Sequence, residues 1–232
     1  MLLNKHNLNI HKFCAKDMTR YALRALLVTK NETVATDGHR MVRITTPKTN
    51  ESLFPSVPDF KADDIEGNLL LHADTAKELV ASIPKKKNKD VPVLSTVRIG
   101  QENGSLRSVA TDLDITHLVQ GKKVDGNFPS WRAVIPVKKP TFEIHVSAQY
   151  LAELCSFAAD VSESGFIRMQ FFGADQAMRI DAENITDGQG MTAILMPARC
   201  TSKYDSCKFD GESPKRAAEK PDTGEQQASL PE

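Results

Sequence analysis

The feature that most constrains the fold of this chain is a pattern that occurs twice: strand, helix, strand, strand, strand. In the first copy, the apolar run at residues 68–72 predicts a strand, and the segment after it predicts a helix with Asp74 as its N-cap and Pro84 at its end. Apolar residues at helical spacing would form the buried face of this helix: Ala76, Leu79, Val80 and Ile83. Three further strands are expected, at residues 93–100, 106–112 and 115–121.

The second copy follows the same order. The alternating segment TFEIHV at residues 141–146 predicts a strand, and Ser147 is placed to cap the helix after it. The buried face of this helix would consist of Leu151, Leu154, Cys155 and Ala158. Three further strands are expected at residues 166–172, 177–184 and 191–197. Hairpin-linked strands with one helix in each copy predict an α+β fold with antiparallel sheets.

The four residues V-A-T-D also occur twice, at residues 34–37 and 109–112. At the first occurrence, Asp37-Gly38 is a dipeptide typical of the turn between two alternating strands. Turn formation accounts for the aspartate and the glycine. It does not account for the basic pair His39-Arg40 that follows them.

Charge is distributed unevenly along the chain, although the net charge is zero. Residues 1–140 contain 22 Lys and Arg against 15 Asp and Glu, a net charge of +7. Residues 141–200 contain 3 against 8, a net charge of −5, and residues 201–232 contain 5 against 7, a net charge of −2. The basic first part permits a polyanionic partner but does not require one, because surface charge is usually solvated.

Several functional classes are disfavoured by composition. The cysteines have no CxxC spacing, which predicts free thiols and no zinc site: Cys14, Cys155, Cys200 and Cys207. No run reaches the roughly 18 apolar residues of a membrane helix, and no signal sequence opens the chain, so we expect a cytoplasmic protein that does not contact membranes. His39 and Asp37 are close in sequence, but no nucleophile or third partner accompanies them. We therefore expect no enzyme, metal or cofactor.

The two ends of the chain lack the pattern of the repeat. Residues 201–232 are rich in Ser, Pro, Lys, Glu and Gly with few apolar residues, and we expect them to be disordered. Disorder is expected for residues 1–12 as well. Residues 12–23 fit either the end of a short helix or a strand, and we favour the strand.

Three segments stand out in addition to the repeat: ATDGHR at residues 35–40, FPSWRAVIP at residues 128–136 and ILMPAR at residues 194–199. In this order, around such a repeat, they resemble the bacterial sliding clamp, the beta subunit of DNA polymerase III. RYALRALLV at residues 20–28 is similar to the family strand that precedes ATDGHR. The resemblance covers about residues 13–200.

The resemblance implies a DNA-clamp fold made of β-α-β-β-β half-domains, whose helices line a ring around duplex DNA and whose sheets form the outer wall. It predicts a domain like the middle domain of a clamp at residues 13–136, with a shortened first half, and half of a domain like the last one at residues 137–200. Because a clamp subunit has three complete domains, the chain is expected to be a truncated or reduced clamp.

In the family, the three segments meet in an outer hydrophobic groove that binds short linear peptides of polymerases, clamp loaders and repair proteins. Carried over residue by residue, the groove would contain Leu23, Thr36, Gly38, His39, Arg40, Met41, Pro129, Ala133, Val134, Ile194, Leu195, Met196, Pro197, Ala198 and Arg199. Methionine and aliphatic side chains suit adaptable apolar pockets, and His39, Arg40 and Arg199 would supply donors at the rim. Ala133 stands where the family commonly has arginine. Trp131 either fills the core or lines the rim.

Contact with double-stranded DNA would be sequence-independent and made through phosphates. The basic residues available are Arg20, Arg24, Lys77, Lys85, Lys86, Lys87, Lys89, Lys122 and Lys123. The lysine run at residues 85–89 equally fits a solvated loop at a helix end. The helix expected after Ser147 has no Lys or Arg and carries Glu153 and Asp160, which makes it a poor surface for phosphate.

Two functions follow from these observations. The first is a processivity factor of DNA replication that assembles as a homo-oligomer around DNA and tethers a polymerase. The second is a clamp-derived module that never encircles DNA and competes for clamp partners or recruits them. Both require the groove, so closure of an oligomer distinguishes them.

Overall fold

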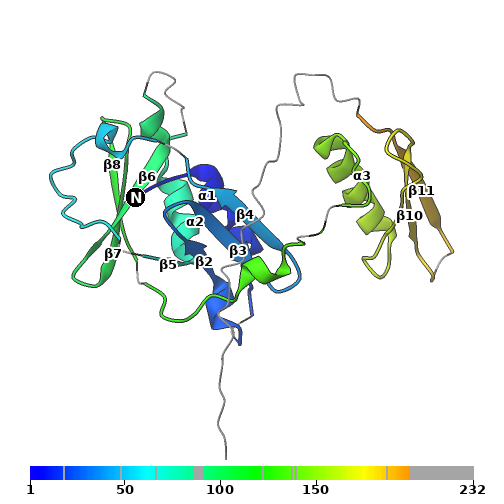
Figure 1. Cartoon of the computed structure of the whole chain (residues 1–232), viewed down its shortest axis with the longest axis horizontal. Coiled ribbons are helices and arrows are strands. Elements are labelled where there is room, and N and C mark those ends of the chain that lie inside the picture. Colours follow the sequence, from blue (N-terminus) through cyan, green and yellow to red (C-terminus); the bar gives the residue numbers. More distant parts are fainter. Residues whose placement is uncertain are drawn as a thin grey trace, which may run out of the picture. The chain divides into compact units, whose positions relative to one another are not determined.

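The computed structural model describes residues 1–198 apart from residues 18, 48, 66, 86–90, 122, 137, 139 and 187 (Figure 1). It divides into two compact units, Met1–Trp131 (unit 1) and Arg132–Glu232 (unit 2). The division lies inside the FPSWRAVIP segment at residues 128–136, where the first expected domain ends. Residues 201–232, for which disorder was predicted, lie outside the described residues.

Unit 1 consists of two half-domains, each with a first strand, a helix and three further strands. The first half contains β1 (Leu2–Asn4), α1 (Lys5–Asn9), the 3₁₀ turns η1 (Ile10–Phe13) and η2 (Tyr21–Arg24), β2 (Ala25–Val28), β3 (Glu32–Thr36) and β4 (Met41–Thr45). The second half contains η3 (Glu51–Leu53), β5 (Leu69–His72), α2 (Ala73–Ser82), η4 (Pro92–Ser95), β6 (Thr96–Glu102), β7 (Ser105–Thr111) and β8 (Thr116–Gly121).

The two halves of unit 1 exchange their first strands. One antiparallel sheet has the order β1-β6-β7-β8 and the other has the order β4-β3-β2-β5. Leu3 of β1 lies opposite Val97 of β6, and Leu71 of β5 lies opposite Leu26 of β2. Each sheet therefore contains a strand from the other half, and neither half is complete alone.

Helices α1 and α2 pack against each other and contribute to a core shared by both sheets. Leu8 of α1 and Leu79 of α2 are fully buried there, with apolar residues from both sheets. A second cluster centres on Phe54, which packs with Leu2, Val93, Leu94 and Val109. The exchanged strand β1 thus contributes one leucine to each cluster, Leu3 to the first and Leu2 to the second.

The expectation of a disordered start at residues 1–12 is wrong. These residues form β1, α1 and most of η1, and Leu3, Leu8 and Ile10 are buried in the main core. Asn4 caps α1 through a capping box with Asn7. A strand of three residues and a helix of five are too short to show a hydrophobic period, so the pattern could not reveal them. The strand favoured for residues 12–23 is also wrong, because the described part of that segment contains 3₁₀ turns.

The N-cap of α2 lies two residues earlier than expected. It is His72, whose Nδ1 accepts a hydrogen bond from the backbone N–H of Asp74 at 3.3 Å, so Asp74 is not the cap. Asp74 instead lies in the first turn, where a carboxylate suits the helix dipole. The helix ends at Ser82 and Ile83 is extended, as expected for a residue that precedes proline.

Unit 2 contains η5 (Trp131–Val134, which begins at the last residue of unit 1), α3 (Ala148–Val161), β9 (Arg168–Gln170), β10 (Met178–Glu183) and β11 (Gly190–Leu195). The strands form an antiparallel sheet of order β11-β10-β9, and α3 lies along one face of it (Figure 1). Ser147 caps α3 by accepting from the N–H of Tyr150 at 3.4 Å, which confirms that prediction.

The strand expected at residues 141–146 does not form a ladder. Among the described residues its backbone makes one long-range hydrogen bond, from the N–H of Ala198 to the carbonyl of His145 at 2.7 Å. Ile144 and Val146 nevertheless pack against the core formed by Ala158 and Ile180. The alternation in the sequence is real, but no strand of the described residues pairs with this segment.

Two of the four cysteines fall in the described residues, Cys14 and Cys155, and both are free. Burial raises the pKa of Cys14 to about 12. Cys200 and Cys207 lie outside the described residues. None of the described helices has the length and apolar character needed to cross a membrane.

Candidate peptide-binding surface

Residues 36–41 form a tight turn between β3 and β4, which we call the GHR turn. Gly38 adopts φ +92°, a conformation that favours glycine. The carboxylate of Asp37 accepts hydrogen bonds from the N–H groups of His39 and Arg40, both at 3.0 Å, and from Nε of Arg40 at 2.9 Å. Thr36 accepts from the N–H of Gly38 at 3.1 Å and donates to the Arg40 carbonyl at 2.9 Å. These bonds hold His39 and Arg40 on an exposed tip.

The same hydrogen bonds keep the carboxyl group of Asp37 in the GHR turn ionised. Hydrogen bonds from the backbone of His39 and then from Arg40 lower the pKa of Asp37 to about 2. The guanidinium of Arg40 lies 5.0 Å from the ring centre of Phe13, a cation–π contact. Arg20 donates to the Asp37 carbonyl at 3.2 Å. Arg40 is therefore paired with an ionised carboxylate, and the turn is partly pre-ordered.

A second turn of the same construction lies at residues 111–116, between β7 and β8. Thr111 accepts from the N–H of Leu113 at 3.0 Å, and Asp112 accepts from the N–H groups of Asp114 and Ile115 at 3.2 and 2.7 Å. Leu113 has φ +83° where the GHR turn has glycine. The repeated V-A-T-D thus encodes one turn used in both half-domains, and only the first copy bears His and Arg.

Several predicted groove residues of unit 1 do lie together. A Cβ added to Gly38 would lie 4.0 Å from Cδ1 of Leu23 and 2.6 Å from Nη1 of Arg20. Met41 opens β4 directly after the turn and is half-buried. Arg20, assigned from the sequence to DNA contact, thus belongs to the surroundings of the GHR turn.

The segment that carries Pro129 is anchored on β4. Trp131 is buried, and the guanidinium of Arg43 lies 5.8 Å from its ring centre. Arg43 also donates to Glu32 of β3. Of the two alternatives for Trp131, burial in unit 1 is the one observed. Pro129, whose carbonyl accepts from the N–H of Trp131 at 2.7 Å, is exposed.

In unit 2 the predicted residues form an apolar strip at the end of β11. Ile194 is 57% exposed and Met196 is 67% exposed, whereas Leu195 points into the core and is 5% exposed. Pro197 is half-buried and Ala198 is exposed. Ala133 and Val134 are exposed on η5, and Arg199 lies outside the described residues.

The candidate DNA-contacting residues are spread over unit 1. Lys77 is exposed on α2, Lys85 and Lys123 are exposed in loops, and Arg24 is half-buried in η2. The others lie outside the described residues: Lys86, Lys87, Lys89 and Lys122.

The candidate DNA-contacting residues chosen from the sequence included no basic residue from the start of the chain. Partial burial, then Lys12 and Lys77, lower the pKa of His11, which places these two lysines near one another. Lys5 on α1 is exposed as well. The expectation of disorder at residues 1–12 hid these residues. Leu8 and Ile10, which lie between them in the sequence, are buried, but elements this short show no hydrophobic period.

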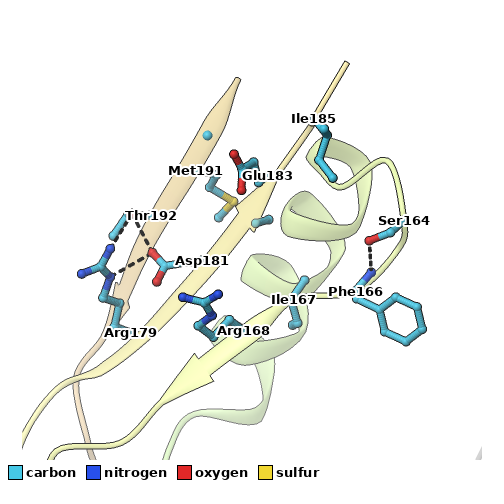
Figure 2. A pocket seen from close by; sticks show the side chains of 12 residues that line it. Ser164, Phe166, Ile167, Arg168, Arg179, Asp181, Glu183, Ile185, Met191 and Thr192 are labelled. Carbon is cyan, nitrogen blue, oxygen red and sulfur yellow. Dashed lines mark hydrogen bonds and ion pairs between the residues drawn. The ribbon is translucent and has the colours of Figure 1, made fainter. Parts of the chain in front are cut away.

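A hollow of about 500 Å³ lies on unit 2, at β9, β10 and β11 (Figure 2). Arg179 and Thr192 both donate to Asp181, at 2.9 and 2.7 Å, and these bonds lower its pKa. Phe166 and Arg168 also line the hollow. It contains none of the predicted groove residues, so it is separate from the apolar strip of β11.

No protein-family model and no curated protein matches the chain. Solved structures do match it. The sliding clamp (DNA polymerase III subunit beta) of Pseudomonas aeruginosa bound to griselimycin has a TM-score of 0.62 at 20% identity, over 85% of this chain and 49% of that chain. DNA polymerase III subunit beta of Borrelia burgdorferi, in complex with a natural product, has a TM-score of 0.63 at 14% identity, over 84% and 48%. The sliding clamp of Bacillus subtilis has a TM-score of 0.61 at 16% identity, over 85% and 48%.

The chain therefore has the α+β DNA-clamp fold that the sequence predicted. The particular structures it resembles are bacterial DNA polymerase III beta subunits. The chain spans about half the length of these clamps. At this identity the similarity establishes the fold.

Proposed function

We propose that this protein is a non-catalytic, clamp-like factor of DNA replication that binds short linear peptides of polymerases, clamp loaders or repair proteins. The observation that carries the proposal is the GHR turn. The same hydrogen-bonded turn occurs twice in unit 1, yet only one copy places a basic pair, His39 and Arg40, on its tip. A structural requirement common to both turns cannot explain that pair.

The chemistry of the proposed surface suits a peptide with apolar anchors. Leu23 and Met41 beside the GHR turn of unit 1 supply aliphatic and thioether groups that adapt to Leu or Phe side chains. Ile194 and Met196 supply the same kinds of group on unit 2. Arg40 supplies charge-assisted donors for backbone carbonyls or acidic side chains of the peptide. Large apolar side chains that remain exposed at a strand end are typical of a binding surface.

The test is binding of a fluorescein-labelled peptide from the clamp-binding segment of a bacterial replicative polymerase, followed by fluorescence anisotropy. We expect saturable binding, and Met196→Asp should weaken it at least about tenfold, because a charge would replace an apolar contact. Leu53→Asp is the matched control: Leu53 is 65% exposed but lies on η3, outside the proposed surface.

Equal affinity of Met196→Asp and the wild-type chain would contradict the contribution of unit 2. Arg40→Ala tests unit 1 in the same assay, and unchanged affinity there would contradict the role of the GHR turn. Absence of any binding by the wild-type chain would contradict peptide recognition as a whole.

The sequence left open whether such a protein encircles DNA. One observation favours a module that does not. Helix α3 has no Lys or Arg and carries Glu153 and Asp160, so it offers no phosphate contacts, whereas α2 exposes Lys77. We retain DNA encirclement as the first candidate because residues 1–140 carry a net charge of +7.

Anisotropy of a labelled DNA duplex over a salt series separates these two candidates. A clamp should bind with an affinity that falls steeply with salt, and Lys77→Glu should weaken it. A module that acts only through peptides should bind the labelled peptide and leave the duplex free at all salt concentrations.

A further inference from the structure

Unit 1 provides an internal example of how two half-domains complete each other. The first strand of each half pairs with the second strand of the other half, β1 with β6 and β5 with β2. The two pairings have the same register, since the N-cap residues Asn4 and His72 lie opposite Thr96 and Ala25, the first residues of β6 and β2. Unit 2 has the elements of one half-domain.

Residues 144–147 of unit 2 occupy the position of β5. Aligning α2 and α3 at their N-caps places His145 at the position of Leu70. The carbonyl of Leu70 accepts a hydrogen bond from Val124, three residues after β8, at 3.1 Å. The carbonyl of His145 accepts one from Ala198, three residues after β11, at 2.7 Å. On one side, residues 144–147 therefore contact the segment that follows the last strand, as β5 does. On the other side, where β5 pairs with β2, residues 144–147 have no described strand.

Strand β9 has an open edge among the described residues, because it pairs with β10 only. Aligning the hairpins β7–β8 and β10–β11 at their last residues, Gly121 and Leu195, places Met169 at the position of Ile99. Ile99 is 0% exposed in the core that contains α1, whereas Met169 is 38% exposed. The edge equivalent to the one that accepts β1 in unit 1 thus has no described strand beside it in unit 2.

Helix α3 also has an apolar side without a cover. Phe157 occupies the position of Ser82 in α2. Ser82 is 8% exposed, whereas Phe157 is 59% exposed. Tyr150, two turns earlier on the same side, is also exposed. Two aromatic side chains on one side of α3 are therefore exposed, whereas Ser82, the equivalent of Phe157, is buried.

We propose that unit 2 is completed by unit 2 of a second copy of this chain, with residues 144–147 of each copy added to the β9 edge of the other. The register of unit 1 assigns the facing pairs: Ser147 with Phe166, Val146 with Ile167, His145 with Arg168 and Ile144 with Met169. The two α3 helices pack together as α1 and α2 do. The product is a complete domain of the architecture seen in unit 1.

The side chains in this register are complementary. Val146 would face Ile167 and Ile144 would face Met169 on the helix side of the sheet. The equivalent pairs in unit 1, Leu71 with Leu26 and Leu69 with Val28, consist of buried residues. Glu143 would lie diagonal to Arg168, which gives opposite charges within reach of each other.

A second copy is the occupant that the geometry favours. A half-domain presents both a strand to donate and an edge to accept one, so a two-fold arrangement of identical copies satisfies both at once. A partner that supplied only one strand would leave the other edge open. The proposal concerns only unit 2 and does not depend on peptide binding, which the Met196→Asp assay tests separately.

Disulfide trapping tests the register directly. In a chain with Cys155, Cys200 and Cys207 replaced by serine, we introduce His145→Cys and Arg168→Cys. Facing residues of an antiparallel ladder have Cα atoms about 4.5–5.5 Å apart, within the range of a disulfide. Mild oxidation should give a covalent dimer on a non-reducing gel, with the two positions joined in mass spectrometry.

The matched control moves one cysteine by a single position. His145→Cys with Ile167→Cys places the two thiols on opposite faces of the sheet, so it should stay monomeric under the same oxidation. Equal cross-linking of both pairs, or a link within one chain, would overturn the proposed register.

Multi-angle light scattering measures the assembly of the unmodified chain. We expect a dimer in the micromolar range, and Met169→Lys should raise its dissociation constant at least tenfold. Leu118→Lys, at an exposed position on β8 of unit 1, should leave it unchanged. A wild-type chain that stays monomeric, or a dimer insensitive to Met169→Lys, would refute the proposal.

Discussion

The second half of unit 1, from β5 to β8, and unit 2 are two versions of the same half-domain. Both have a capped helix, an antiparallel hairpin sheet and one backbone hydrogen bond from the segment after the last strand to the first strand. They differ in burial, because β5 is paired with β2 whereas residues 144–147 are paired with no described strand. The comparison shows that a half-domain forms its hairpins and its helix by itself, but needs another half to cover its first strand.

The helices of the two half-domains, α2 and α3, also differ in the size of the side chains at equivalent positions. In α2, Ser82 and Leu79 are buried. In α3, Tyr150 and Phe157 are exposed, and Phe157 stands at the position of Ser82. Aromatic side chains bury large areas when they are covered, so a partner packed on Tyr150 and Phe157 would bury a large apolar area.

The largest expected effect is the loss of stability caused by a substitution in β5, the first strand that is paired with β2. Leu71→Ala should destabilise unit 1 by about 2–5 kcal/mol, because Leu71 is fully buried and the substitution leaves a cavity. Urea unfolding followed by the fluorescence of Trp131 measures this, since the only tryptophan is buried in unit 1. Val146→Ala, the equivalent change in unit 2, should leave the Trp131 transition unchanged. A shift of similar size for both variants would show that the two units do not unfold independently.

Effects of intermediate size on the stability of unit 1 are expected at the two turns, and their signs should be opposite to each other. Gly38→Ala should destabilise unit 1 by about 1–2 kcal/mol, because a Cβ at φ +92° is strained. Leu113→Gly relieves the same strain in the duplicate turn and should stabilise by about 0.5–1 kcal/mol after the entropy cost of glycine. The Trp131 transition reports both changes. Effects of the same sign would contradict the equivalence of the two turns.

The smallest expected effect is on the stability of unit 1 at acidic pH. The pKa of Asp37 is about 2 in the folded chain, below the value of about 3.9 in an unfolded one. Its carboxylate therefore stabilises the fold above about pH 4, and this contribution is lost as the pH falls towards 2. In Asp37→Asn the urea midpoint should fall less steeply over that range. Asp112→Asn should behave in the same direction, because hydrogen bonds from Ile115 and Asp114 also lower the pKa of Asp112. An unchanged slope in both variants would refute this account.

Much of the fold could be predicted because its signals are local. The strands after each helix lie where alternation placed them, with ends shifted by a few residues, and Ser147 caps α3. The repeated V-A-T-D predicted a turn at Asp37-Gly38, and Thr and Asp side chains do bond the turn backbone there. Such signals involve residues only a few positions apart, so a single sequence contains them.

The errors concern segments whose structure depends on distant partners. Residues 1–12 have too few residues per element for a period, and β1 is held by β6, more than ninety positions away. Residues 141–146 alternate as a strand should, yet form no ladder because a strand needs an edge to pair with. Among the site residues, the position of Arg20 could not be predicted from the sequence. Arg20 contacts Asp37 and Gly38 of the GHR turn, which are 17 and 18 positions away in the chain.

The sequence by itself determined the hairpins, the two longer helices and the turn at Asp37-Gly38, because hydrogen bonds between near neighbours and the spacing of apolar residues specify them. Only the tertiary structure decided which sheet each first strand joins and which apolar residues remain exposed. Strand exchange in unit 1 and the open edge in unit 2 depend on contacts between separate half-domains. The alternating pattern of a strand states which face is apolar, and it does not state which neighbour will cover that face.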